Sequence, residues 1–221
     1  MNRELEERIK QINRDIRGIQ YVNEDSIPDI GLYMDQVIQF LDEHLSTSRR
    51  NDEDKIMTKT MINNYAKSGL IPSPEKKKYT KEHVMILILI YYYKSFMSIS
   101  DIEKFLGPVI DNHYCKPDED IQFTKVFHEI FSSLWDSRET LDGAVDQALE
   151  KAGQTFLEAE GEEQDNLQLI SFISILSQDI ISRLLLIQRL IDTMPEADTK
   201  ASKEKSKSEK NTKEKQAKDK K

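Results

Sequence analysis

Two long stretches of this sequence carry apolar residues at spacings of three and four. In positions 2–20 these residues are Leu5, Ile9, Ile12, Ile16 and Ile19, with charged residues between them. Positions 162–194 carry the same pattern at Leu169, Ile173, Leu176, Ile180, Leu184, Ile187, Ile191 and Met194. Such spacing places the apolar side chains on one face of an α-helix. Because Gly and Pro supply only 7 and 6 of the 221 residues, tight turns are few and the sequence predicts a mainly all-α fold.

The single cysteine and the short apolar runs exclude several classes of protein. Cys115 is the only thiol, so a disulfide framework and a multi-thiolate zinc site are both excluded, and a reducing cytosol suits the chain. The longest uninterrupted apolar run, Val84–Tyr93, has ten residues, whereas a membrane-spanning helix needs roughly 20. The first residues include acids where a signal peptide is basic. We therefore expect a cytoplasmic protein that contacts no membrane.

Positive charge is concentrated in two parts of an otherwise acidic chain of net charge −8. Residues 55–81 hold seven Lys and a single acid, Glu75, and residues 199–221 hold ten Lys and four acids. A polyanion responds to the charge within a Debye length of about 8 Å rather than to the overall balance. Residues 55–81 are therefore a candidate polyanion-binding segment, and the alternative is an ordinary solvated lysine face.

Capping and breaking residues divide the central part of the chain. Thr58 is a candidate N-cap and Gly69 a candidate C-terminal residue for a short helix. Residues 71–79 contain two prolines and predict a turn or a two-stranded wing. Gly107-Pro108 is expected to stop a helix that begins near Ser98. The segments predicted to be helical are 2–20, 32–45, 58–68, 80–96, 98–106, 120–135, 139–157 and 162–194.

The order of these segments over residues 32–106 is that of a winged helix-turn-helix, with Thr58–Ser68 as the recognition helix. At 3.6 residues per turn, Ile62, Tyr65 and Met61 face inward. The outward face then carries Lys59, Thr60, Asn63, Asn64 and Lys67. Lys reaches phosphates and guanine acceptors, Asn pairs with adenine, and Thr contacts phosphate or a thymine methyl group. In the wing, Lys76, Lys77 and Lys78 would contact the DNA backbone. The alternative for the two asparagines is that they are ordinary exposed helix residues.

The same segment resembles the MerR family. In that family a cap residue precedes the recognition helix, a tyrosine lies near its end, and Gly-Leu and Pro follow. The matching residues in this chain are Thr58, Tyr65, Gly69, Leu70 and Pro72. Residues 79–84 resemble the start of the helix after the wing, and residues 98–106 resemble the short closing helix. Over about residues 27–107 the sequence is closer still to a bacterial domain-of-unknown-function family, DUF1836, that is described as MerR-like. The resemblance implies a MerR-like winged helix-turn-helix domain and, by analogy, DNA binding.

We expect four parts along the chain. An N-terminal amphipathic helix occupies residues 1–26, the MerR-like domain residues 27–107, a helical region for dimerisation or effector binding residues 108–195, and a disordered Lys-rich tail residues 196–221. The heptad-patterned helices either pack within one chain or form a coiled coil in a homodimer. The tail either aids solubility or adds nonspecific affinity for DNA.

Catalytic and metal-binding patterns are absent from the sequence. His113, Cys115 and His128 are the only candidate metal cluster, and one thiol is too few for soft-metal sensing. No glycine-rich phosphate loop, nucleophile elbow or His-Glu-x-x-His motif occurs. We therefore expect no enzyme, no catalytic residue, no metal and no cofactor. The repeat of Phe123, Phe127, Phe131 and Trp135 predicts a core stripe, with an effector pocket as the alternative.

These observations predict a bacterial, cytoplasmic transcriptional regulator that binds double-stranded DNA as a homodimer. The eight residues expected to contact DNA are Lys59, Thr60, Asn63, Asn64, Lys67, Lys76, Lys77 and Lys78. The alternative is a protein–protein interaction module that keeps the winged core but does not bind DNA. Its long acidic body and heptad helices suit partner helices. No effector ligand is identified by the sequence.

Overall fold

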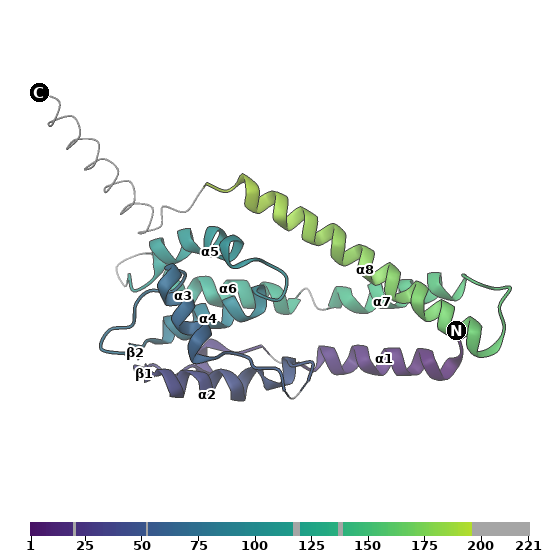
Figure 1. The fold of residues 1–221 in the computed structure, drawn as a ribbon, viewed down its shortest axis with the longest axis horizontal. Coiled ribbons are helices and arrows are strands. Elements are labelled where there is room, and N and C mark those ends of the chain that lie inside the picture. The colour runs from purple at the N-terminus through teal and green to yellow at the C-terminus, as the bar shows by residue number, and fades with distance from the viewer. Residues whose placement is uncertain (20, 52, 117–119, 137–138, 196–221) are drawn as a thin grey trace, which may run out of the picture.

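The computed structural model describes residues 1–19, 21–51, 53–116, 120–136 and 139–195 (Figure 1). Over these residues the chain forms eight α-helices and one two-stranded sheet. The mainly all-α fold predicted from the sequence is therefore confirmed. The predicted Lys-rich tail, residues 196–221, lies outside the described residues.

The larger of two hydrophobic cores is built around α4, Lys81–Tyr93. Its residues Val84–Ile90 are all buried, as expected for an uninterrupted apolar run. Thr80 caps this helix as predicted. The core is completed by residues from β1 (Leu32–Tyr33), α2 (Met34–Leu45), α3 (Lys59–Ser68), β2 (Lys78–Tyr79), α5 (Ile99–His113) and α6 (Phe123–Asp136).

The aromatic repeat of α6 belongs to this core. Phe123, Phe127 and Phe131 are buried, and the rings of Phe127 and Phe131 lie 4.3 Å apart between centroids. The predicted core stripe is confirmed for these three residues. The side chain of Trp135 lies outside the described set.

Several predicted helix boundaries are wrong: the helices predicted at 2–20, 80–96 and 139–157 end at Arg17, Tyr93 and Gly153. Two further errors have a tertiary cause. Leu32 does not begin α2, because Leu32 and Tyr33 pair in antiparallel register with Tyr79 and Lys78. This pairing buries Leu32 and Tyr79 together, which a helical Leu32 would not allow. Gly107-Pro108 does not stop α5, which continues to His113. Proline removes one backbone hydrogen bond from a helix, but Ile110 lies beyond it in the core and favours continuation of the helix.

The second core joins three helices at the other end of the molecule: α1 (Arg3–Arg17), α7 (Glu139–Gly153) and the N-terminal half of α8 (Gly161–Thr193). Polar contacts hold them together. Asn13 of α1 donates to Asp142 of α7 at 2.7 Å, and the backbone N–H of Asn2 donates to Asp165 of α8 at 2.6 Å. The buried side chains of this core are Val145, Ala148, Leu149, Ala152 and Phe172.

Helix α8 connects the two cores. It packs on α7 at its N-terminal half, and near its C-terminus Ile191 is buried and α5 is in contact (Figure 1). Lys104 of α5 also donates to the backbone carbonyl of Asp192 at 3.2 Å. Between these two anchors the helix is open, and its large exposed apolar side chains are Ile170, Ile173, Ile180, Ile181, Leu185, Leu186 and Leu190.

By length and composition alone, α8 could cross a membrane, and only 6% of its most apolar 18-residue window is buried. Serines and a few charged residues interrupt its apolar residues without ending the helix, so α8 contains no uninterrupted apolar run as long as Val84–Tyr93. The absence of membrane contact therefore stays a prediction.

Candidate nucleic-acid interface

Helix α3 has the ends and the buried face that its sequence predicts. The Oγ1 atom of Thr58 accepts a hydrogen bond from the backbone N–H of Met61 at 3.2 Å. Gly69 ends the helix with φ of +87°, a left-handed conformation that glycine adopts without steric cost. Ile62 and Tyr65 are buried, and Met61 is half-buried. The opposite face of α3 is consequently free to meet solvent.

All five polar residues predicted on the outward face of α3 are exposed: Lys59, Thr60, Asn63, Asn64 and Lys67. Lys59 has a partner of its own, because its Nζ lies 2.6 Å from Oδ1 of Asp35 at the start of α2. Both side chains of this ion pair are largely exposed. An exposed pair of this kind contributes little stability and is readily exchanged.

The three predicted wing lysines lie on a tight turn that leads into β2. The N–H of Lys78 donates to the carbonyl of Glu75 at 2.9 Å, which closes the turn. The two residues between them, Lys76 and Lys77, have positive φ values of 50° and 63°. All three lysine side chains are exposed. The ammonium group of Lys78 also lies 5.7 Å from the centre of the Tyr33 ring, which orients it along β1.

Helix α3 and the 75–78 turn lie at the same end of the molecule, away from α1 and α7 (Figure 1). Two buried residues after α3, Leu70 and Ile71, anchor the connecting chain, and the N–H of Ile71 donates to the carbonyl of Tyr65 at 3.3 Å. Both elements that carry the predicted contact residues therefore lie at one end of the fold.

His83 of α4 holds the chain that connects α3 to α4 at Pro72 and Thr80. Its Nε2 lies 3.1 Å from the carbonyl of Pro72, and its Nδ1 accepts the backbone N–H of Thr80 at 3.0 Å. These two partners define a neutral imidazole with the proton on Nε2. Burial lowers the pKa of His83, and the hydrogen bond to Pro72 opposes this in part. Sequence reasoning missed this residue, although its position as the third residue after the cap Thr80 was a usable signal.

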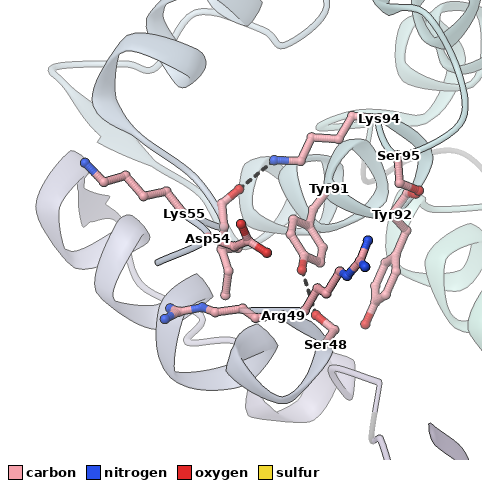
Figure 2. A pocket seen from close by; sticks show the side chains of 10 residues that line it. Ser48, Arg49, Asp54, Lys55, Tyr91, Tyr92, Lys94 and Ser95 are labelled. Carbon is pink, nitrogen blue, oxygen red and sulfur yellow. Dashed lines mark hydrogen bonds between the residues drawn. The ribbon is translucent and has the colours of Figure 1, made fainter. Parts of the chain in front are cut away.

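A polar pocket of about 420 Å³ lies beside the start of α3 and was not predicted. Its walls come from the segment after α2 and from the C-terminal end of α4 (Figure 2). The lining residues are Ser48, Arg49, Arg50, Asp54, Lys55, Ile56, Tyr91, Tyr92, Lys94 and Ser95. The sequence contains the four basic residues of this pocket, Arg49, Arg50, Lys55 and Lys94. It does not show that they lie together, because this depends on how the loop after α2 packs against α4.

The three candidate metal ligands each have other contacts. Nδ1 of His113 lies 2.8 Å from the carbonyl of Ile121, the backbone N–H of Cys115 donates to Glu82, and His128 contacts Glu24. Over the part of the chain that the structure describes, no three potential ligands gather as a metal site. The expectations of no metal, no cofactor and no enzymatic activity stay predictions.

The larger core includes residues of α3 and the buried Ile71 and Tyr79 on either side of the 75–78 turn, and it draws its buried residues from Val22 to Phe131. Residues 22–130 match the family described as Domain of unknown function (DUF1836). The DUF1836 region therefore coincides with this core and includes α3, the turn and the polar pocket. No curated protein and no solved structure matches the chain.

Proposed function

We propose that the DUF1836 region is a MerR-like winged helix-turn-helix that binds double-stranded DNA. In this proposal α2 and α3 form the helix-turn-helix, α3 enters the major groove, and β1, β2 and the 75–78 turn form the wing. The observation that supports it most directly is that all eight predicted contact residues are exposed, on two elements that lie at the same end of the fold. The chain would act as a cytoplasmic transcriptional regulator.

The chemistry of this surface suits a duplex. Five of the eight residues are lysines, and residues 55–81 carry seven lysines and one acid within an acidic chain. Lysines neutralise phosphates, and each such contact lowers log K by about 0.9 per log unit of salt. Asn63 and Asn64 add the bidentate donor and acceptor pair that adenine requires in the major groove.

The testing experiment is fluorescence anisotropy with a random-sequence duplex at 50 and 200 mM salt, using the full chain. Replacing Lys76, Lys77 and Lys78 together with Glu should abolish salt-sensitive binding. The matched control replaces three exposed lysines elsewhere, Lys10, Lys125 and Lys151, with Glu and makes the same change in net charge. Unchanged affinity in the first variant, or equal loss in the control, would contradict the proposed contact surface.

The helical end of the molecule supports a homodimer as part of the same proposal. Its core has only five buried side chains, while Ile12 and Ile16 of α1 and Ile180 of α8 are about half exposed or more. A second copy would cover these side chains through a two-fold symmetric contact. The ion pair between Asp179 and Arg183 lies near the middle of α8, and charges at that depth are costly in hydrocarbon. A protein partner therefore suits α8 better than a lipid bilayer.

A second candidate function is a protein–protein interaction module that does not bind DNA. The exposed apolar residues of α8 favour it, because contiguous apolar surface marks an interaction site. The anisotropy experiment separates the two candidates. Absence of duplex binding at 50 mM salt, in a chain that is folded and dimeric by light scattering, supports the interaction module.

A further inference from the structure

The polar pocket beside α3 carries an excess of positive charge. Four of its ten lining residues are basic, namely Arg49, Arg50, Lys55 and Lys94, and one is acidic, Asp54. The carboxylate of Asp54 already accepts the backbone N–H of Asn51 at 3.1 Å. This excess is unusual in a chain of net charge −8, and it indicates an anionic ligand.

The deeper basic groups are held in place before any ligand arrives. Nζ of Lys94 donates to the carbonyl of Ile56 at 2.7 Å and lies 5.1 Å from the centre of the Tyr91 ring (Figure 2). Lys94 is partly buried, and this loss of water around its ammonium group lowers its pKa. An anion placed beside this ammonium group would restore that lost stabilisation.

Arg49 is also positioned, and part of it lacks a partner. Its Nη2 lies 2.7 Å from Oδ1 of Asp42, and its side chain is only 20% exposed. Its Nε is buried and has no hydrogen-bond partner among the described residues. A buried N–H without an acceptor is costly, and an anionic oxygen in the pocket would supply one.

Hydroxyl groups complete the lining. Ser48 Oγ and Tyr91 Oη form a hydrogen bond of 2.7 Å, and Ser95 lies on the same wall. Ile56 and the tyrosine rings add apolar surface. The volume of about 420 Å³ is in the range of small-molecule sites.

We propose that this pocket binds a small organic phosphate. A phosphate group accepts several charge-assisted hydrogen bonds at once, so it matches a set of arginine, lysine and hydroxyl donors better than a single carboxylate does. The apolar and aromatic wall would contact the organic part of the molecule. Binding here does not depend on DNA.

A regulatory consequence follows if the proposed DNA-binding function holds. The carbonyl that holds Lys94 belongs to Ile56, which is buried together with Met57 directly before the α3 cap Thr58. A ligand that binds Lys94 would therefore contact the group that holds Ile56 just before the start of α3. The pocket would act as an effector site for the recognition helix.

The test titrates the full chain with phenyl phosphate by isothermal calorimetry at constant ionic strength and without DNA. Inorganic phosphate serves as the comparison that lacks the organic part, and phenol as the comparison that lacks the charge. Phenyl phosphate should bind more tightly than inorganic phosphate, and phenol should not bind. Absence of measurable binding by phenyl phosphate at millimolar concentration would overturn the proposal.

Paired variants locate the site. Replacing exposed Arg50 and Lys55 with Gln should weaken phenyl phosphate binding about tenfold or more without affecting folding. The matched control replaces Lys10 and Lys125 with Gln, which are exposed outside the pocket, and should leave affinity unchanged. Equal weakening in both pairs would show a general charge effect and would overturn the assignment.

A competition arm separates a free organic phosphate from a DNA backbone phosphate. Phenyl phosphate should still bind when duplex DNA is present in excess. Loss of phenyl phosphate binding on adding duplex would assign the pocket to the DNA backbone and overturn the proposal of a separate ligand. Failure of duplex binding leaves the calorimetric result unaffected, so the two proposals fail independently.

Discussion

Lys59 and Asp35 form an ion pair of 2.6 Å between Nζ and Oδ1, and this pair joins the first turn of α3 to the first turn of α2. Lys59 is one of the residues proposed to contact DNA, so the protein itself supplies a carboxylate where a phosphate would otherwise bind. Because both side chains are largely exposed, the carboxylate is a weak competitor that a phosphate can displace.

Replacing Asp35 with Asn should therefore tighten duplex binding. The change frees Lys59 and removes a negative charge next to the phosphates, so we expect affinity at 100 mM salt to rise about three- to tenfold. The slope of log K against log salt should steepen by about 0.9 if Lys59 gains one phosphate. Fluorescence anisotropy measures both. Replacing Glu43 with Gln at the far end of α2 is the matched control, and an equal gain there would contradict the explanation.

In the 75–78 turn, two of the lysines proposed to bind DNA have backbone conformations that lower the stability of the fold. Lys76 and Lys77 have positive φ values that a side chain disfavours, at a cost of roughly 1–2 kcal/mol per residue. Replacing Lys77 with Gly should raise the free energy of unfolding by up to about 1 kcal/mol, because glycine adopts this conformation without strain. The same variant should bind duplex DNA more weakly. Urea denaturation and anisotropy check the two effects, and a fall in stability would contradict the strain argument.

His83 predicts a loss of stability in mild acid. Burial lowers its pKa from the ordinary value of 6.5, so the unfolded chain takes up a proton at a higher pH than the folded chain does. The stabilisation is complete above pH 6.5 and is lost progressively as the pH falls through and below that value. Urea denaturation at pH 7.5 and 5.5 should show the decrease. Replacing His83 with Gln should reduce the decrease, and an equal decrease in this variant would contradict the explanation.

The exposed face of α8 predicts a dimer that a single charge can break. Replacing Ile180 with Glu should shift the full chain from dimer to monomer in light scattering, because a buried unpaired carboxylate is costly in an apolar contact. Replacing exposed Ser133 of α6 with Glu adds the same charge away from α8 and should leave the dimer intact. A monomeric natural chain at micromolar concentration would contradict the dimer, and flotation of that monomer with phospholipid vesicles would assign α8 to the membrane instead.

The local features of the fold could be predicted because they depend on a few neighbouring residues. Thr58 and Gly69 delimit α3 through its own backbone hydrogen bonds and its own φ value, and the buried Ile62 and Tyr65 follow from helical spacing. Apolar periodicity likewise predicted α8, since the pattern persists through its serines.

The features that the sequence did not predict depend on distant contacts. The sequence around Leu32 predicts a helix, but Leu32 pairs with Tyr79 in the sheet. Pro108 predicts a helix end, but α5 continues past it and Ile110 packs in the core. The polar pocket requires Lys94 of α4 to meet the backbone of Ile56 across 38 positions of sequence. No local pattern contains such pairings, so the exposure of the outward face of α3 could be predicted and the pocket could not.

The two anchors of α8 carry a geometric consequence for the proposed DNA-binding dimer. A helix of 33 residues is about 50 Å long, and it is held to α7 at one end and to α5 at the other. In a dimer joined through α8, a rigid helix of this length would keep the two copies of α3 at one separation and one relative rotation. Inserting a single base pair between half-sites turns one of them by about a tenth of a revolution, a mismatch that a rigid helix does not absorb.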